Sequence, residues 1–193
     1  MSHHIYTTPG FVILSKPYGE SGKFFLIFTR DLGMIGATAQ GVRLSLSKLR
    51  YHVKDYSYNL FSLVRGKEVW RLTGAKDIAK EKIINPENRK LYVLILSLLK
   101  RFMHGEEKNE KLFEIIHNLY AFLSRKENKD KKELIEYLTV LRILHCLGYI
   151  SNKNYFKDMI SSSIINEDIL NNVQIETNHI IKDINNALKE SQL

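Results

Sequence analysis

The chain has 193 residues, with 29 Lys and Arg against 21 Asp and Glu, so its net charge is +8 with neutral histidines. Its composition, 44% hydrophobic and 26% charged, is that of a globular protein and excludes a disordered or low-complexity chain. The single cysteine excludes a disulfide framework and a cysteine-rich zinc site, and no apolar run is long enough for a membrane span. We expect a cytoplasmic protein with one large domain or two small ones.

The positive charge is concentrated in the first part of the chain. Residues 1–80 contain twelve basic and five acidic side chains, a balance of +7. Residues 81–193 contain seventeen basic and sixteen acidic side chains, a balance of +1. This asymmetry indicates a polyanionic partner, either nucleic acid or an anionic membrane surface.

Residues 11–74 predict five β-strands separated by glycine-containing turns. The loop between the third and fourth strands, residues 42–54, is long and contains four basic residues and no acidic one. Five strands with one long loop are typical of an OB-fold barrel. The strands are expected at 11–15, 24–29, 34–40, 56–64 and 68–73.

The chain after residue 80 predicts helices. Residues 85–88 have the residue types of a helix start, with Asn85 as the N-cap and Pro86 in the first turn. A second helix is expected at about 109–124, and a third carries leucines at helical spacing and is ended by Gly148.

The charged segment 125–132 is expected to be a solvated connection between the second and third helices. After Tyr149 only residues 180–188 clearly indicate a helix. The fold class is therefore α+β in two domains. An OB-fold nucleic-acid-binding domain is expected in residues 1–80, followed by an all-α partner-binding domain in residues 81–193.

The sequence contains none of the common catalytic motifs. The acidic residues of the predicted barrel are scattered, one per element, which does not suit a two-metal nuclease site. His145 and Cys146 are adjacent on a helix and point about 100° apart, so they cannot act as a base and its nucleophile. We predict no enzyme, no cofactor and no metal site.

Basic and aromatic side chains are interleaved in the predicted barrel. Basic side chains can follow a phosphate backbone while aromatic rings stack on unpaired bases, and OB-folds bind single strands in this way. Alternating aromatic residues are also typical of a core face, so at least one of Tyr56 and Tyr58 is expected to pack inside. The basic residues do not lie on an amphipathic helix, which makes a membrane partner the weaker prediction. The candidate DNA-binding residues are Lys16, Lys23, Arg43, Lys48, Arg50, Lys54, Arg65, Lys67 and Arg71, interleaved with Tyr18, Tyr51, Tyr56, Tyr58 and Trp70.

Five short segments in order carry a family resemblance. They are Tyr-Gly-Glu-Ser-Gly-Lys at 18–23, then 28–35, 39–43, 65–73 and Leu-Arg-Ile-Leu-His-Cys-Leu-Gly-Tyr at 141–149. Together they cover about residues 8–150 and resemble the RecO family of DNA repair proteins. The resemblance implies an OB-fold followed by a helical domain. It also implies a non-enzymatic recombination mediator that binds single- and double-stranded DNA and promotes annealing.

The resemblance further implies partners and a nucleoid-associated, cytoplasmic location. Such a mediator engages RecR and single-strand-binding protein, and helps to load RecA onto coated strands. The acidic tail of single-strand-binding protein would dock between helices, with Arg142 as the cation for its terminal carboxylate and Leu138 and Leu141 on the same helix. The alternative for Arg142 is a surface pair with Glu133 or Glu136.

The sequence departs from the family pattern in three places. Many members carry a four-cysteine zinc module after the Leu-Gly-Tyr segment, whereas Cys146 is alone here. Gln40 stands at a strand position that is often basic in the family, and the region after Tyr149 is short and divergent. Two other functional classes stay open: a helical adaptor with a scaffold barrel, and an enzyme that acts on DNA.

Overall fold

The chain forms two compact units. The computed structural model describes residues 4–78, 84–103, 105–125 and 131–190. One unit comprises Met1–Glu81 with Met103–Glu110, and the other comprises Lys82–Phe102 with Lys111–Leu193. The sequence predicts a boundary near residue 80, but it gives no sign that Met103–Glu110 returns to the first unit.

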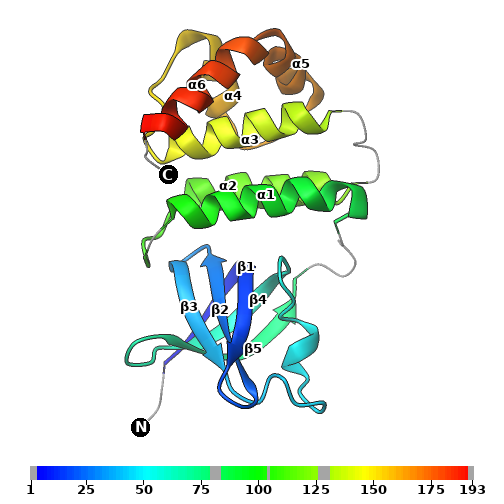
Figure 1. The fold of residues 1–193 in the computed structure, drawn as a ribbon, viewed down its shortest axis with the longest axis vertical. Helices are drawn as coiled ribbons and strands as arrows, with labels where there is room; N and C mark the ends of the chain where they lie inside the picture. Colours follow the sequence, from blue (N-terminus) through cyan, green and yellow to red (C-terminus); the bar gives the residue numbers. More distant parts are fainter. Residues whose placement is uncertain (1–3, 79–83, 104, 126–130, 191–193) are drawn as a thin grey trace. The chain divides into compact units, whose positions relative to one another are not determined.

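The first unit is a closed barrel of five strands (Figure 1). The strands pair in the order β1-β2-β3-β5-β4, and β4 closes the barrel by pairing with β1. Only the β3–β5 pair is parallel. This is the OB-fold that the sequence predicts. The strands are β1 Ile5–Tyr18, β2 Gly22–Thr29, β3 Gly33–Ala39, β4 Tyr58–Val64 and β5 Trp70–Asp77, with the 3-10 helix η1 Leu49–Tyr51 in the β3–β4 loop.

The first strand is much longer than the predicted 11–15. Its first half pairs with β4 and its second half with β2, and the register shifts between Val12 and Leu14 where the two halves meet. A strand that takes part in two sheet edges needs this length to close the barrel. The predicted turn at 16–19 is therefore displaced, and β1 continues to Tyr18.

The barrel interior is filled by alternate side chains of its strands. Val42 and Val53, at the two ends of the β3–β4 loop, are buried with them and anchor the loop to the core. Trp70 is 4% exposed and belongs to the same cluster. The other members include Val12, Phe25, Ile27, Ile35, Ala37, Ala39, Phe61, Leu63 and Leu72.

The described residues of the second unit form helices and their connections. Helix α3 contacts α1, α4, α5 and α6, and its buried residues form the centre of the unit (Figure 1). None of the described helices is both long enough and apolar enough to cross a membrane. The helices are α1 Pro86–Phe102, α2 Glu110–Leu123, α3 Lys132–Cys146, η2 Asn154–Phe156, α4 Lys157–Ser161, α5 Glu167–Ile175 and α6 Thr177–Glu190.

Two predicted helix ends are confirmed. Asn85 precedes α1, and its side-chain oxygen accepts a hydrogen bond from the backbone N–H of Glu87 at 3.2 Å. Gly148 follows α3 with φ +83°, and its N–H donates to the carbonyl of His145 at 3.1 Å. A left-handed glycine of this kind satisfies the last carbonyls of a helix.

The chain after Tyr149 is more helical than the sequence indicates. The predicted helix at 180–188 lies within α6, but α4 and α5 were not expected. They have five and nine residues, which is too short for a clear hydrophobic period. Of the charged connection expected at 125–132, residues 126–130 lie outside the described residues.

Candidate nucleic-acid interface

Four residues form a row across the outer face of the barrel. Lys16 of β1 pairs with Phe24 of β2. Thr38 of β3 pairs with Phe24 on one side and with Arg71 of β5 on the other. Residues directly opposite each other point to the same side of a sheet, and the next residue along β2, Phe25, points into the core. We call Lys16, Phe24, Thr38 and Arg71 the outer-face row.

Phe24 is the aromatic member of this row. Its ring is half-buried, and the Lys16 Nζ lies 5.2 Å from the ring centroid. Gly36, beside it on β3, leaves room for the ring: a Cβ there would lie 2.9 Å and 3.0 Å from two ring carbons. The row therefore places a cation and an aromatic ring together on an open face, which suits a phosphate and a base.

Phe24 was not among the residues expected in the interface. It begins a continuous apolar run, Phe24-Phe25-Leu26-Ile27-Phe28, and such a run does not tell which face of a strand is exposed. The sequence gives only a weak indication that Phe24 is exposed. Lys16 lies opposite Phe24 when β1 and β2 pair as a hairpin, so the two side chains share one face.

Lys23 is less available than the other predicted basic residues. It lies on the inward-facing side of β2, at the end of the barrel, and is half-buried. Its Nζ donates a hydrogen bond to the Ser15 hydroxyl at 3.2 Å. In contrast, Tyr18 in the same hairpin is 59% exposed and could stack on a base.

The β3–β4 loop is fixed to the β1–β2 turn. The backbone N–H of Arg43 donates to the Ser21 carbonyl at 2.9 Å, and the Arg43 guanidinium donates to the Glu20 carbonyl at 3.2 Å. At the other end of the loop, the His52 ring lies 2.9 Å from the Asp77 carboxylate. Four predicted basic side chains of this loop are exposed: Arg43, Lys48, Arg50 and Lys54.

The β4–β5 loop carries Arg65 and Lys67, and both are exposed. Arg65 already has an anionic partner, because its guanidinium forms an ion pair with the Glu106 carboxylate. Glu106 also accepts a hydrogen bond from the Trp70 Nε1 at 3.1 Å, and the Arg65 guanidinium lies 4.9 Å from the Trp70 ring centroid. The charge of Arg65, one of the predicted DNA contacts, is thus already partly neutralised by Glu106.

Two of the predicted aromatic residues pack against other side chains of the barrel unit instead of facing a ligand. Trp70 is buried in the core. Tyr58 is half-buried and stacks on Phe11, with ring centroids 4.5 Å apart. The exposed rings are Tyr18 and Tyr51, the latter 64% exposed and beneath the Arg50 guanidinium.

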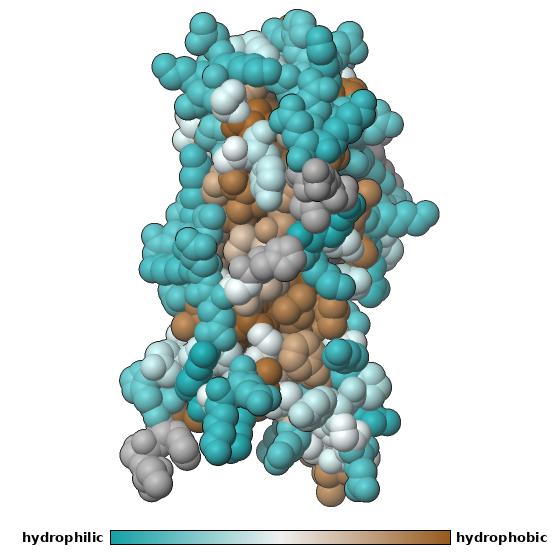
Figure 2. Space-filling model, turned by 60° about the vertical axis from the view of Figure 1, so that its left-hand side comes forward, coloured by the Kyte–Doolittle hydropathy of each residue, from teal (hydrophilic) through white to brown (hydrophobic). Residues whose placement is uncertain are grey.

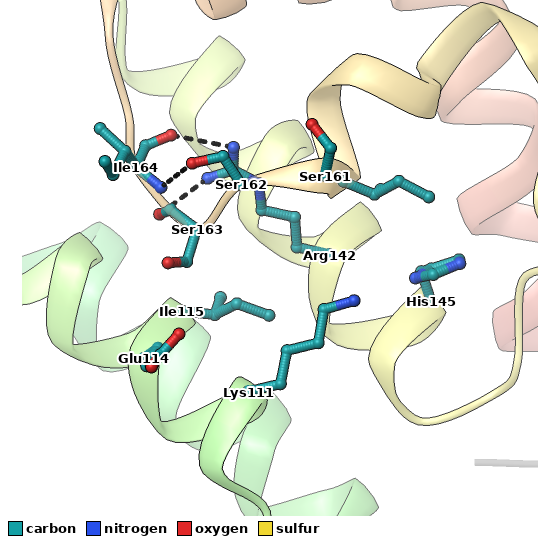
Figure 3. A pocket seen from close by; sticks show the side chains of 10 residues that line it. Lys111, Glu114, Ile115, Arg142, His145, Ser161, Ser162, Ser163 and Ile164 are labelled. Carbon is teal, nitrogen blue, oxygen red and sulfur yellow. Dashed lines mark hydrogen bonds between the residues drawn. The ribbon is translucent and has the colours of Figure 1, made fainter.

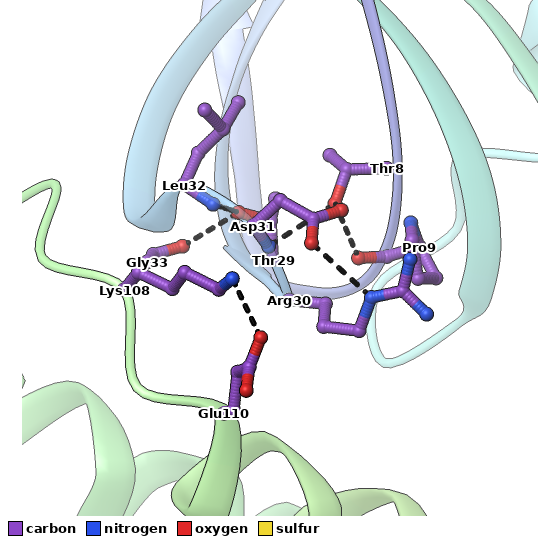
Figure 4. A network of polar contacts seen from close by, with 9 residues as sticks. All are labelled: Thr8, Pro9, Thr29, Arg30, Asp31, Leu32, Gly33, Lys108 and Glu110. Carbon is purple, nitrogen blue, oxygen red and sulfur yellow. Dashed lines mark hydrogen bonds and ion pairs between the residues drawn. The ribbon is translucent and has the colours of Figure 1, made fainter.

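The segment Met103–Glu110 packs on the β2–β3 turn (Figure 4). Gly33 has φ +69°, and a Cβ there would lie 2.3 Å from the Glu107 carbonyl oxygen. The Met34 N–H donates to the Gly105 carbonyl at 3.2 Å. Glycine is required at position 33 both for the turn and for this close approach.

Polar contacts hold the same turn to β1 (Figure 4). The Thr8 hydroxyl donates to the Asp31 carboxylate at 2.7 Å, and the Arg30 Nε lies 3.2 Å from the other carboxylate oxygen. Burial would raise the pKa of Asp31, but the hydrogen bonds from Thr8 and Arg30 outweigh this and keep it below its ordinary value. These contacts stabilise the barrel and leave the outer-face row open.

The helical unit contains a pocket of about 390 Å³ (Figure 3). Its lining combines apolar and polar surface and includes two cationic side chains, one carboxylate and a run of three serines. Arg142 lies in its wall and is 3% exposed, and burial lowers its pKa to about 10. The residues that line the pocket are Lys111, Glu114, Ile115, Arg142, His145, Ile160, Ser161, Ser162, Ser163 and Ile164.

Arg142 links α3 to α4 and to the segment that follows α4. Its guanidinium donates to the backbone carbonyls of Met159 at 2.7 Å, Ser163 at 3.1 Å and Ile164 at 2.9 Å. The alternative of a surface pair with Glu133 or Glu136 is therefore wrong, since Arg142 is buried and donates to backbone carbonyls.

Leu138 and Leu141 have no exposed surface and do not line the pocket. They are core residues of α3, so a partner cannot reach them in this structure. Within the described ranges, no group of three or more His, Cys, Asp or Glu side chains is placed to hold a metal ion.

The fold and the site define the chain as an OB-fold protein with an appended helical unit and a basic outer barrel face. Residues 1–80 match the N-terminal domain of recombination protein O. The chain is 31% identical over 158 residues to the DNA repair protein RecO of Alkaliphilus metalliredigens, a match that covers 80% of this chain and 61% of the relative. It is 26% identical over 148 residues to that of Dehalococcoides mccartyi, covering 76% of this chain and 57% of the relative.

Residues 1–80 thus match the N-terminal domain of the RecO family, and most of the chain is similar to DNA repair proteins named RecO. A further relative, the DNA repair protein RecO of Bacillus velezensis, is 25% identical over 151 residues, or 76% of this chain and 57% of the relative. The chain spans about three fifths of the length of the curated relatives that it matches.

Proposed function

We propose that this protein is a non-enzymatic recombination mediator in DNA repair that binds single- and double-stranded DNA through its barrel and promotes strand annealing. The observation that carries the proposal is the outer-face row, in which the exposed Lys16 lies beside the half-buried ring of Phe24 and the exposed Arg71 lies beyond Thr38. The names of the relatives, DNA repair proteins, support the same role.

The chemistry of this face suits binding without sequence specificity. Lysine and arginine side chains on strands and loops neutralise phosphates, and such contacts position DNA without reading its sequence. Phe24, Tyr18 and Tyr51 offer faces on which bases can stack, whatever the base. A mediator that anneals complementary strands needs both properties.

Fluorescence anisotropy with labelled single strands and duplexes tests the proposal. Four to six phosphate contacts should lower the affinity ~50-fold to ~2,000-fold between about 50 and about 200 mM salt. Affinity that does not change with salt would contradict phosphate binding. Cleavage of the DNA that requires a divalent metal would instead favour the alternative of an enzyme.

The helical unit is proposed to bind the acidic, Phe-terminated tail of single-strand-binding protein in the pocket of Figure 3. A terminal carboxylate needs a cationic partner when it leaves water. Lys111 lines this pocket and is exposed, whereas the Arg142 guanidinium is held by three carbonyls. The pocket therefore supports tail docking with Lys111 as the first contact and Arg142 as the second.

Calorimetry with a tail peptide tests this docking. Lys111→Ala should weaken peptide binding by about 1.5–3 kcal/mol, the range for a hydrogen bond to a charged group. Lys157→Ala, which removes an exposed lysine outside the pocket, is the matched control. Equal affinity of the wild type and Lys111→Ala would exclude this pocket as the docking site.

The wider assembly is proposed on the similarity to RecO proteins. As a mediator, the protein would act with RecR and assist loading of RecA onto strands coated by single-strand-binding protein, in the nucleoid of the cytoplasm. Binding of the tail peptide without any DNA affinity would favour the alternative of a helical adaptor with a scaffold barrel.

A further inference from the structure

The β3–β4 loop exposes large hydrophobic side chains. Leu46 is 93% exposed, Leu44 is 57% exposed and Tyr51 is 64% exposed. Hydrophobic side chains reach the surface elsewhere as well (Figure 2), but these three lie within eight residues of one loop. A cluster of this kind is typical of a surface that a ligand covers.

The loop holds its leucines outward by its own structure. Val42 and Val53 bury its two ends in the barrel core. The Leu44 N–H donates to the Gly41 carbonyl at 3.1 Å, and the Ser47 N–H donates to the Leu44 carbonyl at 3.1 Å. These two successive turns fix the backbone at the tip of the loop, so the two leucines are exposed by an ordered backbone conformation.

The surroundings of the two leucines are cationic. Arg43 precedes them, Lys48, Arg50 and Lys54 follow them, and no acidic residue lies between residues 40 and 54. Among the residues that the structure describes, none of Lys48, Arg50 and Lys54 forms an ion pair. The ligand that complements this loop therefore combines negative charge with exposed apolar faces.

We propose that the tip of the β3–β4 loop inserts Leu44 and Leu46 against unstacked bases at the point where a DNA duplex opens or closes. This inference rests on the proposed function, because it takes the barrel as the DNA-binding unit. Other DNA-binding proteins insert apolar side chains between base steps and recover the unstacking cost through the contacts that follow. The flanking cations of the loop would hold the phosphates of the separated strands.

DNA is favoured over an anionic lipid surface or an acidic peptide by the position of the loop. Arg43 attaches the start of the loop to Ser21 in the β1–β2 turn. The strands on either side of that turn carry Lys16 and Phe24 of the outer-face row. The outer-face row and the attached start of the loop therefore lie toward the same end of β1 and β2, so one DNA molecule could contact both.

The test compares a forked DNA with a blunt duplex, both labelled with 2-aminopurine, using the full chain. Leu44→Ser with Leu46→Ser should raise the Kd for the fork about five- to tenfold and abolish the fluorescence increase from base unstacking. The Kd for the blunt duplex should stay within about twofold, because the phosphate contacts remain. Ile175→Ser, which removes a residue 78% exposed in the helical unit, is the matched control and should behave as the wild type.

Three results would overturn the inference. Unchanged fork affinity and fluorescence in the double variant would exclude insertion while leaving DNA binding by the barrel intact. A wild type that binds neither DNA would remove the inference together with the proposed function. Binding of the wild type to anionic phosphatidylserine vesicles that is lost in the double variant, with fork binding unchanged, would assign the loop to a lipid surface.

Discussion

The Arg65 guanidinium forms an ion pair with the Glu106 carboxylate while it lies over the Trp70 ring. Glu106 comes from the segment between α1 and α2, and it also accepts the Trp70 indole N–H at 3.1 Å. The β4–β5 loop is one of the two loops through which OB-folds bind oligonucleotides. Because Glu106 already pairs with Arg65, this carboxylate would compete with a phosphate for Arg65 if the barrel binds DNA as proposed.

Glu106→Gln should therefore increase DNA affinity. Loss of the carboxylate frees Arg65 for one more phosphate contact, which adds up to about 0.7 to the log–log salt slope for a single strand. We expect an affinity about two- to fourfold higher at low salt, measured by anisotropy. Glu107→Gln removes the same charge from the neighbouring residue. An equal gain in both variants would mean that net charge, and not the Arg65 contact, is responsible.

Phe24→Leu should weaken single-strand binding more than duplex binding. Leucine keeps an apolar side chain on the outer face but removes the ring on which a base can stack, and such stacking contributes about 1–3 kcal/mol. We expect a Kd for single strands raised about fivefold or more, with the duplex Kd almost unchanged. Parallel titrations of the two DNAs measure this. Equal losses for both DNAs would show that Phe24 acts only through the barrel's packing.

Arg142→Ala should destabilise the helical unit. The substitution leaves the carbonyls of Met159, Ser163 and Ile164 without their donor. A buried polar group left unsatisfied costs about 1–3 kcal/mol, so we expect a loss of at least about 2 kcal/mol. Urea unfolding followed by helical circular dichroism measures it. Arg142→Lys should recover only part of the lost stability, because a lysine ammonium lacks the planar guanidinium whose N–H groups reach several acceptors at once. A loss of stability under about 0.5 kcal/mol would contradict this stabilising role of Arg142.

Asp183 should make the stability of the helical unit depend on acid pH. Its carboxylate lies 2.6 Å from the Lys153 Nζ and accepts the Tyr155 hydroxyl. Burial raises its pKa, but the hydrogen bonds from Lys153 and Tyr155 outweigh this and lower it. Because the pKa of Asp183 is lower in the folded than in the unfolded protein, its ionised carboxylate stabilises the folded state. This contribution is complete above the unfolded-state pKa of about 3.9 and is lost as the pH falls through the folded-state pKa.

Asp183→Asn should thus lose about 1–2 kcal/mol near neutral pH, and the difference from the wild type should shrink below about pH 4. Urea unfolding at a series of pH values measures this difference. Asp158→Asn, on the exposed side of α4, is the matched control and should show little change. A difference between wild type and Asp183→Asn that stays constant from neutral to acid pH would contradict the role given to the carboxylate.

The barrel could be predicted from the sequence because its turns and strand residues are local signals. Gly148 at the end of α3 is a signal of the same kind. The partners of Arg142 could not be predicted, because they are carbonyls of the short helix α4 and of the irregular segment after it, which show no clear hydrophobic period. The hydrogen bond between Glu106 and Trp70 could not be predicted either. The two residues are 36 positions apart, and Glu106 lies in a connection between two helices.

The exposure of the candidate residues could be predicted better for the charged side chains than for the aromatic rings. Charge is visible in the sequence wherever a residue lies, and eight of the nine basic candidates are exposed. Whether an aromatic residue faces solvent depends on the register of its strand. Trp70 therefore turned out to be a core residue, and Phe24 a member of the outer-face row.

The salt dependence of single-strand binding by Lys16→Ala with Arg71→Ala tests the central claim most directly. Loss of two phosphate contacts should reduce the log–log slope by about 1.4 relative to the wild type. Lys157→Ala with Lys189→Ala removes the same charge from exposed positions of the helical unit and should leave the slope unchanged. A slope for the outer-face variant equal to that of the wild type would show that DNA does not bind along this row.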